Sequence, residues 1–304
     1  MSENKAVIAL TGATGFVGRE VLNRLVRDGY HVRSLVRSSS IHKVGTYANV
    51  EWVEGQLDDP DSDVALVKGA NIVIHMAGLI TARTKSQYER INAHAVGSLA
   101  NAAQKAGASR FLYLSSLAAK APELSLYAWS KERGEVALSD NFPEEKAVVV
   151  RAPAVFGAED VATAPIYACV RKGFLPAPGG RRWKERLLSL IYVDDLADFI
   201  AELCGSNKFD GQTVSPSTRA AISWPDFADA CSKATHKNVK TLPLPLSVLY
   251  PVAGLTTIVK AMTGKGHLTL GKLGEFLYDD WSVTGDLQSE TDFHLALKKT
   301  IEDT

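Results

Sequence analysis

Residues 5–37 read KAVIALTGATGFVGREVLNRLVRDGYHVRSLVR, and this stretch decides the fold. The apolar run at 6–10 is typical of a buried strand, and the apolar residues that follow from Phe16 recur at helical spacing. Gly12, Gly15 and Gly18 lie between the two, three residues apart. A strand, a glycine-rich turn and a helix, followed by a second strand over 31–37, predict a βαβ unit.

The three glycines have two interpretations. Glycine permits the backbone angles of a sharp turn from a strand into a helix, which is a purely structural role. The absence of Cβ atoms also lets a pyrophosphate approach the backbone N–H groups at the helix N-terminus, where the helix dipole favours negative charge. The flanking strand and helix favour the second interpretation, and we expect a dinucleotide to bind here.

Strands and helices continue to alternate along the first half of the chain. Further strands are predicted at 50–55, 70–78, 110–116 and 146–157, with helices over 88–107 and after 125. This order is typical of the α/β class, with a Rossmann-type doubly wound parallel sheet and a smaller C-terminal substrate-binding lobe. We expect a dinucleotide-binding core over 1–155 and a lobe mainly over 156–304, with some elements returning to the core.

The composition argues against several classes of protein. The 304 residues include 34 Lys and Arg and 34 Asp and Glu, so net charge gives no reason to expect a nucleic-acid partner. Three scattered cysteines and dispersed histidines predict neither a disulfide framework nor a metal site. A reducing, cytoplasmic setting is therefore expected.

No stretch predicts an integral membrane segment. The apolar run near the N-terminus is too short for a signal-peptide core or a spanning helix. The most apolar later stretch, 242–262, contains three prolines and a lysine. We expect a buried helix or a wall of a substrate pocket there, and contact with a membrane is left open.

A second motif carries the chemistry. Residues 125–135 read SLYAWSKERGE, and Tyr127 and Lys131 are four apart, so they share one helix face. Acid–base work near neutral pH requires the pKa of a tyrosine to fall by roughly 2 to 3 units, and a neighbouring ammonium group favours the phenolate. Such a pair is also common on solvated surfaces, but this one follows a strand end that carries Ser115 and Ser116.

Five motifs in this order resemble the extended short-chain dehydrogenase/reductase superfamily, in its NAD(P)-dependent epimerase/dehydratase branch. They are TGATGFVG (11–18), RFLYLSS (110–116), YAWSK (127–131), RAPAVFG (151–157) and IYVDDLADFI (191–200). The resemblance implies that Tyr127 donates or accepts the proton and that Lys131 binds the ribose and lowers the tyrosine pKa. It also implies that Ser116 binds the substrate oxygen. Asn92 would brace the site or make a structural hydrogen bond.

The resemblance also implies an NAD(P) site along the strand ends. The pyrophosphate would lie against Gly12, Thr14, Gly15, Phe16, Val17 and Gly18. Adenine would lie between Gln56 and Leu57, although the family often has an acidic residue where Gln56 stands. The remaining expected contacts are Ala77, Gly78, Ser115, Tyr127, Lys131 and, beside the nicotinamide, Pro153, Ala154 and Val155.

The end of the second strand decides which cofactor is expected. NAD-selective relatives usually have an acidic residue there, whereas this chain has Arg37, which can pair with a 2′-phosphate with support from Ser38. Strand alternation points Arg33 to solvent. We expect NADP, with NAD as the alternative.

Three functions are compatible with these motifs. We expect an NADP-dependent reductase or dehydrogenase acting on a small-molecule carbonyl or alcohol with an apolar body, because Ala154 replaces an asparagine common in nucleotide-sugar enzymes. A nucleotide-sugar epimerase or dehydratase with retained NAD(P) is the first alternative. Basic residues 181, 182, 184 and 186 would clamp a diphosphate in such an enzyme, although a basic run in a loop usually forms a solvated face. A non-catalytic NADP-binding sensor or assembly subunit is the second. The family also implies a homodimer, through helices over 86–106 and 127–140.

Overall fold

The computed structural model describes residues 5–160, 163–263 and 268–303, and the chain divides into two compact units. Unit 1 combines Met1–Arg151 with Leu196–Val214, and unit 2 combines Ala152–Asp195 with Ser215–Thr304. The chain therefore passes from one unit to the other three times. That the first unit binds the nucleotide and the second the substrate stays a prediction.

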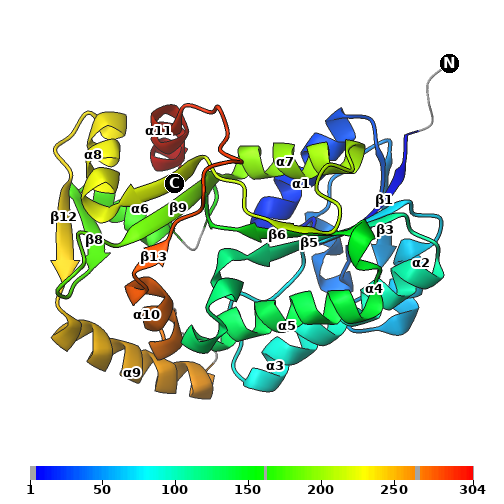
Figure 1. Cartoon of the computed structure of the whole chain (residues 1–304), viewed down its shortest axis with the longest axis horizontal. Coiled ribbons are helices and arrows are strands. Elements are labelled where there is room, and N and C mark those ends of the chain that lie inside the picture. The colour runs from blue at the N-terminus through cyan, green and yellow to red at the C-terminus, as the bar shows by residue number, and fades with distance from the viewer. Residues whose placement is uncertain (1–4, 161–162, 264–267, 304) are drawn as a thin grey trace. The chain divides into compact units, whose positions relative to one another are not determined.

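A seven-stranded parallel sheet forms the centre of unit 1 (Figure 1). Its order is β10-β6-β5-β4-β1-β2-β3, so the sequence order reverses between β1 and β4, where sheets of this class bind ligands. The strands are β1 Val7–Thr11, β2 His31–Val36, β3 Val50–Glu54, β4 Ile72–His75, β5 Arg110–Ser116, β6 Ala147–Ala152 and β10 Gln212–Val214. The predicted Rossmann-type α/β sheet is confirmed.

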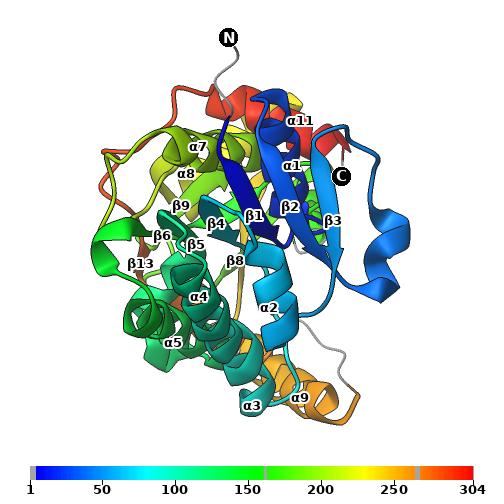
Figure 2. The ribbon, with the colours of Figure 1, turned by 90° about the vertical axis from the view of Figure 1, so that its right-hand side faces the viewer.

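Helices cover both faces of this sheet (Figures 1 and 2). One face carries α1 and α7, and the other carries α2, α4 and α5. Their bounds are α1 Phe16–Arg27, α2 Pro60–Val67, α4 Ala95–Lys105, α5 Leu126–Asn141 and α7 Val193–Gly205. The first three residues of α7 belong to unit 2 and the rest to unit 1.

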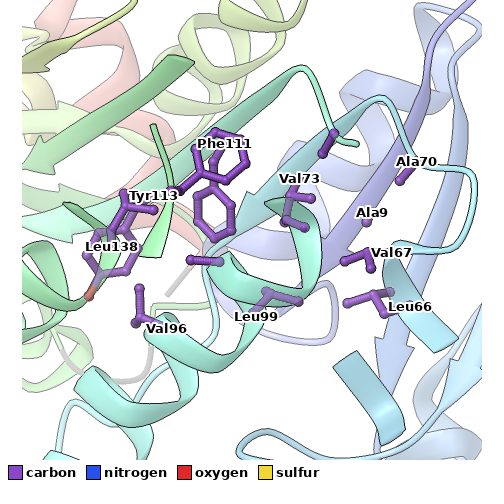
Figure 3. Close-up of a cluster of buried hydrophobic side chains, with 14 of the residues drawn as sticks. Ala9, Leu66, Val67, Ala70, Val73, Val96, Leu99, Phe111, Tyr113 and Leu138 are labelled. Atoms are coloured by element: carbon purple, nitrogen blue, oxygen red, sulfur yellow. The ribbon is translucent and has the colours of Figure 1, made fainter. Parts of the chain in front are cut away.

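Figure 3 shows the apolar cluster that joins α2, α4 and α5 to the sheet. Phe111 and Tyr113 project from β5, and Leu99 of α4 and Leu138 of α5 pack against the same cluster. All four side chains are at most 1% exposed. Burial of large apolar groups is the main favourable term in folding, so this cluster fixes α5 against the end of β5.

The long helix expected over 88–107 is interrupted. It consists of α3 Lys85–Glu89, a π-helical turn Arg90–His94 and α4. Asn92 lies in the π turn and is 1% exposed. π turns inside helices are frequent at functional sites because they shift side chains and free backbone groups.

The edge strand β10 is tied to the sheet by a buried ion pair. Arg110 of β5 pairs with Asp210, and its guanidinium also donates to the carbonyl oxygen of Leu203 at the end of α7. The Arg110 side chain is 7% exposed. A buried guanidinium needs such partners, so β5 depends on residues about a hundred positions later in the chain.

The described part of unit 2 contains two small sheets and five helices. β9 is flanked by β11 and β13 and also pairs with β7, while β8 pairs with β12. The strands are β7 Ala154–Phe156, β8 Phe174–Pro178, β9 Leu187–Tyr192, β11 Arg219–Ser223, β12 Lys240–Leu244 and β13 Asp280–Trp281. The helices are α6 Ala164–Arg171, α8 Trp224–Thr235, α9 Leu246–Thr263, α10 Leu270–Leu277 and α11 Phe293–Asp303.

For 242–262 the expectation of a buried helix is wrong, whereas a wall of a substrate pocket stays a prediction. Leu249 and Ala253 of α9 are buried against Leu273 of α10, but Leu255 and Ile258 on another face are 64% and 60% exposed. The helix finds a partner for one face only. In the described ranges, no helix is long and apolar enough to cross a bilayer.

A buried carboxyl group lies between α2 and α4. Asp63 is 1% exposed, and its Oδ2 accepts a hydrogen bond of 2.5 Å from Ser98. Its Oδ1 has no hydrogen-bond partner in the described part of the chain. Burial, reinforced by Asp59 and Asp58, raises the pKa of Asp63 to about 6.

We therefore predict that Asp63→Asn stabilises the protein at pH 8 and changes little at pH 4. The folded state favours the neutral acid, so Asp63 lowers the free energy of unfolding as pH rises from the ordinary aspartate pKa through about 6. At pH 8 the gain should be on the order of 2 to 3 kcal/mol, measured by urea unfolding. Asp61→Asn, at an exposed position of the same helix, is the control, and equal effects of both variants would contradict the prediction.

Candidate active site

The glycine turn after β1 is closely packed. Gly12 has a φ of +87°, and a Cβ there would lie 2.9 Å from the backbone nitrogen of Ala77. A Cβ on Gly18 would lie 1.9 Å from the carbonyl oxygen of Gly12. No side chain caps α1 at Gly15, and its first turn has no acidic residue. The turn thus fits an anion near these N–H groups, as the nucleotide prediction requires.

Lys131 is buried beneath the first turn of α5. It is 6% exposed, its Nζ donates a 2.9 Å hydrogen bond to the carbonyl oxygen of Leu114, and Nζ lies 4.4 Å from the centre of the Tyr113 ring. Burial lowers the pKa of Lys131 to about 7, while Glu135 raises it. Tyr127 precedes Lys131 by one helical turn and is half-buried.

A neutral histidine lies below this ammonium group. His75, at the end of β4, stacks on Tyr113 with ring centres 5.8 Å apart. Burial and then Lys131 lower the pKa of His75 to about 3, so the ring is uncharged at neutral pH. Thr11 Oγ1 accepts hydrogen bonds from the backbone nitrogens of Met76 and Ala77. It lies 2.9 Å from His75 Nδ1, so the Thr11 hydroxyl can donate its own hydrogen to Nδ1.

Asn92 connects the loop after β4 to α5. Its Nδ2 donates to the carbonyl oxygen of Leu79 and to Ser130 Oγ, both at 2.9 Å, and its Oδ1 accepts from the backbone nitrogen of Leu79. Ser130 in turn donates to the carbonyl oxygen of Tyr127 at 2.8 Å. Asn92 is therefore placed to brace the turn that carries Tyr127, and it also fixes the loop at Leu79.

The two serines at the end of β5 differ. Ser115 donates its hydroxyl hydrogen to Glu135, which also forms a two-point ion pair with Arg151. Ser116 Oγ accepts from the backbone nitrogen of Ala118 at 3.2 Å and caps the next turn. A hydroxyl that accepts can still donate, so Ser116 retains a hydrogen for a substrate oxygen. Ser115 Oγ can still accept a hydrogen bond, so its contact with a cofactor stays a prediction.

Arg37 follows β2 and opens a 3₁₀ turn at Ser38–Lys43. Its side chain is exposed and makes no ion pair with the described residues. Ser38 donates its hydroxyl hydrogen to Glu54, so an acidic group lies beside the same turn. Arg33 does not point freely to solvent as expected, because it donates to the carbonyl oxygens of Ala65 and Leu66 at the end of α2.

The other predicted positions in unit 1 are placed as follows. Gln56 is exposed after β3, whereas Leu57 packs against the apolar cluster of Figure 3. Ala77 is half-buried beside Gly12, and Gly78 is exposed. Thr14 lies within the glycine turn, and Phe16 and Val17 are the first residues of α1.

Pro153, Ala154 and Val155 lie in unit 2, where Ala154 and Val155 belong to β7 and pair with β9. Their contact with the nicotinamide stays a prediction. In the basic run 181–186, Arg186 is not solvated: it is buried and donates to the carbonyl oxygens of Pro178 and Gly179. Asp195, near the start of α7, accepts hydrogen bonds from Thr218 and Thr291 and so ties elements of unit 2 together.

Sequence reasoning missed four residues around Lys131, namely His75, Tyr113, Glu135 and Arg151. Glu135 follows Lys131 by four residues, and this helical spacing could have identified it. The other three lie on different strands, and nothing in a single sequence pairs them. Among the described residues, no cluster of three His, Cys, Asp or Glu forms a potential metal site.

Residues 12–148 match a family model described as NAD(P)H-binding. A ceramide reductase from Caulobacter vibrioides (strain NA1000 / CB15N) is 33% identical over 291 residues, which cover 95% of this chain and 90% of that protein. The chain belongs to the extended short-chain dehydrogenase/reductase superfamily.

Other similar proteins differ in what their names describe. A UDP-glucose 4-epimerase from Thermus thermophilus, solved in complex with NAD, has a TM-score of 0.71 and 16% identity, with 98% of each chain covered, and shows a shared fold. A mouse protein named NADH dehydrogenase [ubiquinone] 1 alpha subcomplex subunit 9, mitochondrial, is 30% identical over 164 residues. These cover 52% of this chain and 43% of the mouse protein.

For an NAD(P)-binding member of this superfamily, the low pKa of Lys131 has a measurable consequence. At pH 8 the ligand-free lysine is mostly neutral, and the negative charge of a bound dinucleotide should raise its pKa again. We predict that binding takes up part of a proton at pH 8 and that affinity falls as pH rises from about 7 to 9.

Calorimetry in two buffers of different ionisation heat measures this uptake. Lys131→Met should remove it, whereas Lys68→Met, at an exposed position after α2, should leave it unchanged. Equal proton uptake by the Lys131 variant and the unmodified protein would contradict the prediction.

Proposed function

We propose that this protein is an NADP-dependent oxidoreductase acting on a carbonyl or alcohol of a substrate with an apolar body. The observation that carries the proposal is the burial of Lys131, one helical turn after Tyr127 on α5. Its ammonium group bonds to the Leu114 carbonyl oxygen of β5, the strand that ends at Ser116. When bound, the reduced nicotinamide supplies the hydride. The phenol of Tyr127 gives the proton to the substrate oxygen in reduction and takes it back in oxidation.

Each neighbouring residue has a role in that proton transfer. Lys131 in its charged form favours the phenolate of Tyr127, and its bond to the Leu114 carbonyl holds the ammonium group in place. Ser116 donates its remaining hydrogen to the substrate oxygen, where negative charge develops. Asn92 is a positioning residue, because it acts on Tyr127 through Ser130.

The substrate class is inferred from the relative and from the chain. The Caulobacter protein that is 33% identical over most of this chain is named a ceramide reductase. A carbonyl on a long-chain lipid of the ceramide kind meets the expectation of an apolar substrate. We infer that this chain reduces such a carbonyl with NADPH.

Two other functions have support and would give different results. A nucleotide-sugar epimerase would convert its substrate with no net change in nicotinamide absorbance. The mitochondrial relative named as a subunit supports a non-catalytic, assembly role. In that case no carbonyl would consume NADPH, although NADPH would still raise the unfolding temperature.

We predict that Tyr127→Phe lowers kcat by about 10²- to 10⁴-fold, because the proton of the reaction loses its donor. The reaction is followed as NADPH consumption with a panel of long-chain ketones and nucleotide sugars. The NADPH-induced thermal shift should be retained, which separates catalysis from binding.

Tyr30→Phe is the control for this variant, since that phenol lies near Lys5 at the opposite end of β2 from Arg37. Unchanged turnover in the Tyr127 variant would reject the proposed proton transfer. Conversion of nucleotide sugars alone would favour the epimerase.

We predict that Arg37→Ala weakens NADP binding by about 10- to 100-fold and changes NAD binding little, because an ion-paired hydrogen bond to the 2′-phosphate is lost. Glu54→Gln should act in the opposite direction, since the carboxylate bonded to Ser38 repels that phosphate. Calorimetric titration of NADP and NAD into the unmodified protein and the two variants measures the six affinities. Equal losses for NADP and NAD in the Arg37 variant would reject the assignment.

A further inference from the structure

Apolar side chains are exposed along one broad side of α9. Val248, Val252, Leu255 and Val259 recur at helical spacing and are 39% to 64% exposed. Tyr250 and Ile258 widen this surface, with 52% and 60% exposed. We call these six residues the α9 apolar face.

This exposure is concentrated in one part of the chain. In the described residues, eight of the thirteen exposed large apolar side chains fall between Leu242 and Leu270. Contiguous exposed apolar surface on this scale marks an interaction site, whereas single exposed residues are ordinary. The inner side of α9 is already occupied, because Leu249 and Ala253 pack against Leu273.

The segment around α9 is free of acidic residues, although the charges of the whole chain balance. Residues 230–274 contain six lysines and two histidines but no Asp or Glu. Lys260 is the only charged residue within α9. Burial and the nearby ammonium of Lys272 lower the pKa of Lys260, and Lys272 itself pairs with Glu275 at 2.8 Å. An apolar face on a helix that carries one lysine and no acidic residue is complementary to an anionic lipid surface.

We propose that the α9 apolar face inserts into the interface of a bilayer that contains anionic lipids, with the helix lying along the membrane. Val248, Leu255 and Ile258 would enter the boundary between headgroups and acyl chains, and Lys260 would remain at the level of the lipid phosphates. The helix lies on the bilayer and does not span it, in keeping with the absence of a spanning helix from the described ranges.

A second copy of the chain is the competing occupant. A self-contact through α9 would offer Lys260 no acidic partner from the α9 of the other copy, because Lys260 is the only charged residue of that helix. Anionic lipid headgroups supply the missing negative charge. The electrostatics therefore favour a lipid surface over self-association.

Membrane docking goes beyond the proposed reductase activity and does not depend on it. The two are related in one respect, since a reductase for long-chain lipids must meet its substrate at a bilayer. The test below uses no substrate, so its failure would leave the proposed activity intact.

The experiment is co-sedimentation of the full chain with vesicles. One set contains phosphatidylcholine with phosphatidylglycerol, and the other contains phosphatidylcholine alone. We expect binding to the first set, weaker binding to the second, and release from the first as salt is added. Leu255→Glu should lower the partition coefficient by about tenfold or more, because a charge replaces a leucine that would enter the membrane.

Leu295→Glu is the matched control, because Leu295 of α11 is 66% exposed and Leu255 is 64% exposed. It should leave vesicle binding unchanged, whereas Lys260→Glu should weaken binding to the anionic vesicles only. The NADPH-induced thermal shift, measured without vesicles, verifies that each variant is folded.

Three results would overturn the proposal. One is the absence of binding to either set of vesicles, and another is equal loss of binding in the Leu255 and Leu295 variants. The third is a dimer, measured by light scattering, that Leu255→Glu converts to a monomer, since this would assign the face to a second copy.

Discussion

Burial of the Lys131 ammonium group is the constraint on which the candidate active site depends. A charged amine at 6% exposure is costly unless it is paired, and here its partners are one backbone carbonyl, the face of an aromatic ring and, more distantly, Glu135. The tyrosine ring is fixed by the apolar cluster below the sheet, and the carbonyl by β5. The position of the charge is therefore set by the core of unit 1 and not by a mobile loop.

Close approach of α5 to its neighbours makes this arrangement possible. A Cβ at Gly134 would lie 2.3 Å from the carbonyl oxygen of Asn92 and 2.4 Å from the Tyr113 hydroxyl. A larger residue at position 134 would push α5 away from Asn92 and Tyr113, and Lys131 would move with the helix. The π turn that contains Asn92 and the glycine of α5 thus serve one purpose, which is to hold the lysine against β5.

The sequence was informative where the signal is local. The glycine turn, the strand periodicities and the spacing of Tyr127 and Lys131 predicted the confirmed sheet and the helix that carries the dyad. It was uninformative where residues meet from distant elements, as His75 of β4 and Tyr113 of β5 do beneath Lys131. Apolar content predicted burial of α9, but it could not tell which faces of that helix find a partner. Likewise, the basic run predicted a phosphate clamp or a solvated face for Arg186, whereas carbonyl oxygens of Pro178 and Gly179 accept its hydrogens in the interior.

The return of residues 196–214 to unit 1 affects how this protein can be divided. A shortened chain that stopped near residue 155 would contain every residue of the glycine turn and the dyad, yet it would lack the last strand of the sheet. Arg110 would then be a buried cation stripped of Asp210 and of the Leu203 carbonyl, and β6 would present its bare backbone edge to other molecules. Unit 1 can be isolated with its whole sheet only if residues 196–214 are joined to 1–151, because its last strand follows part of unit 2 in the chain.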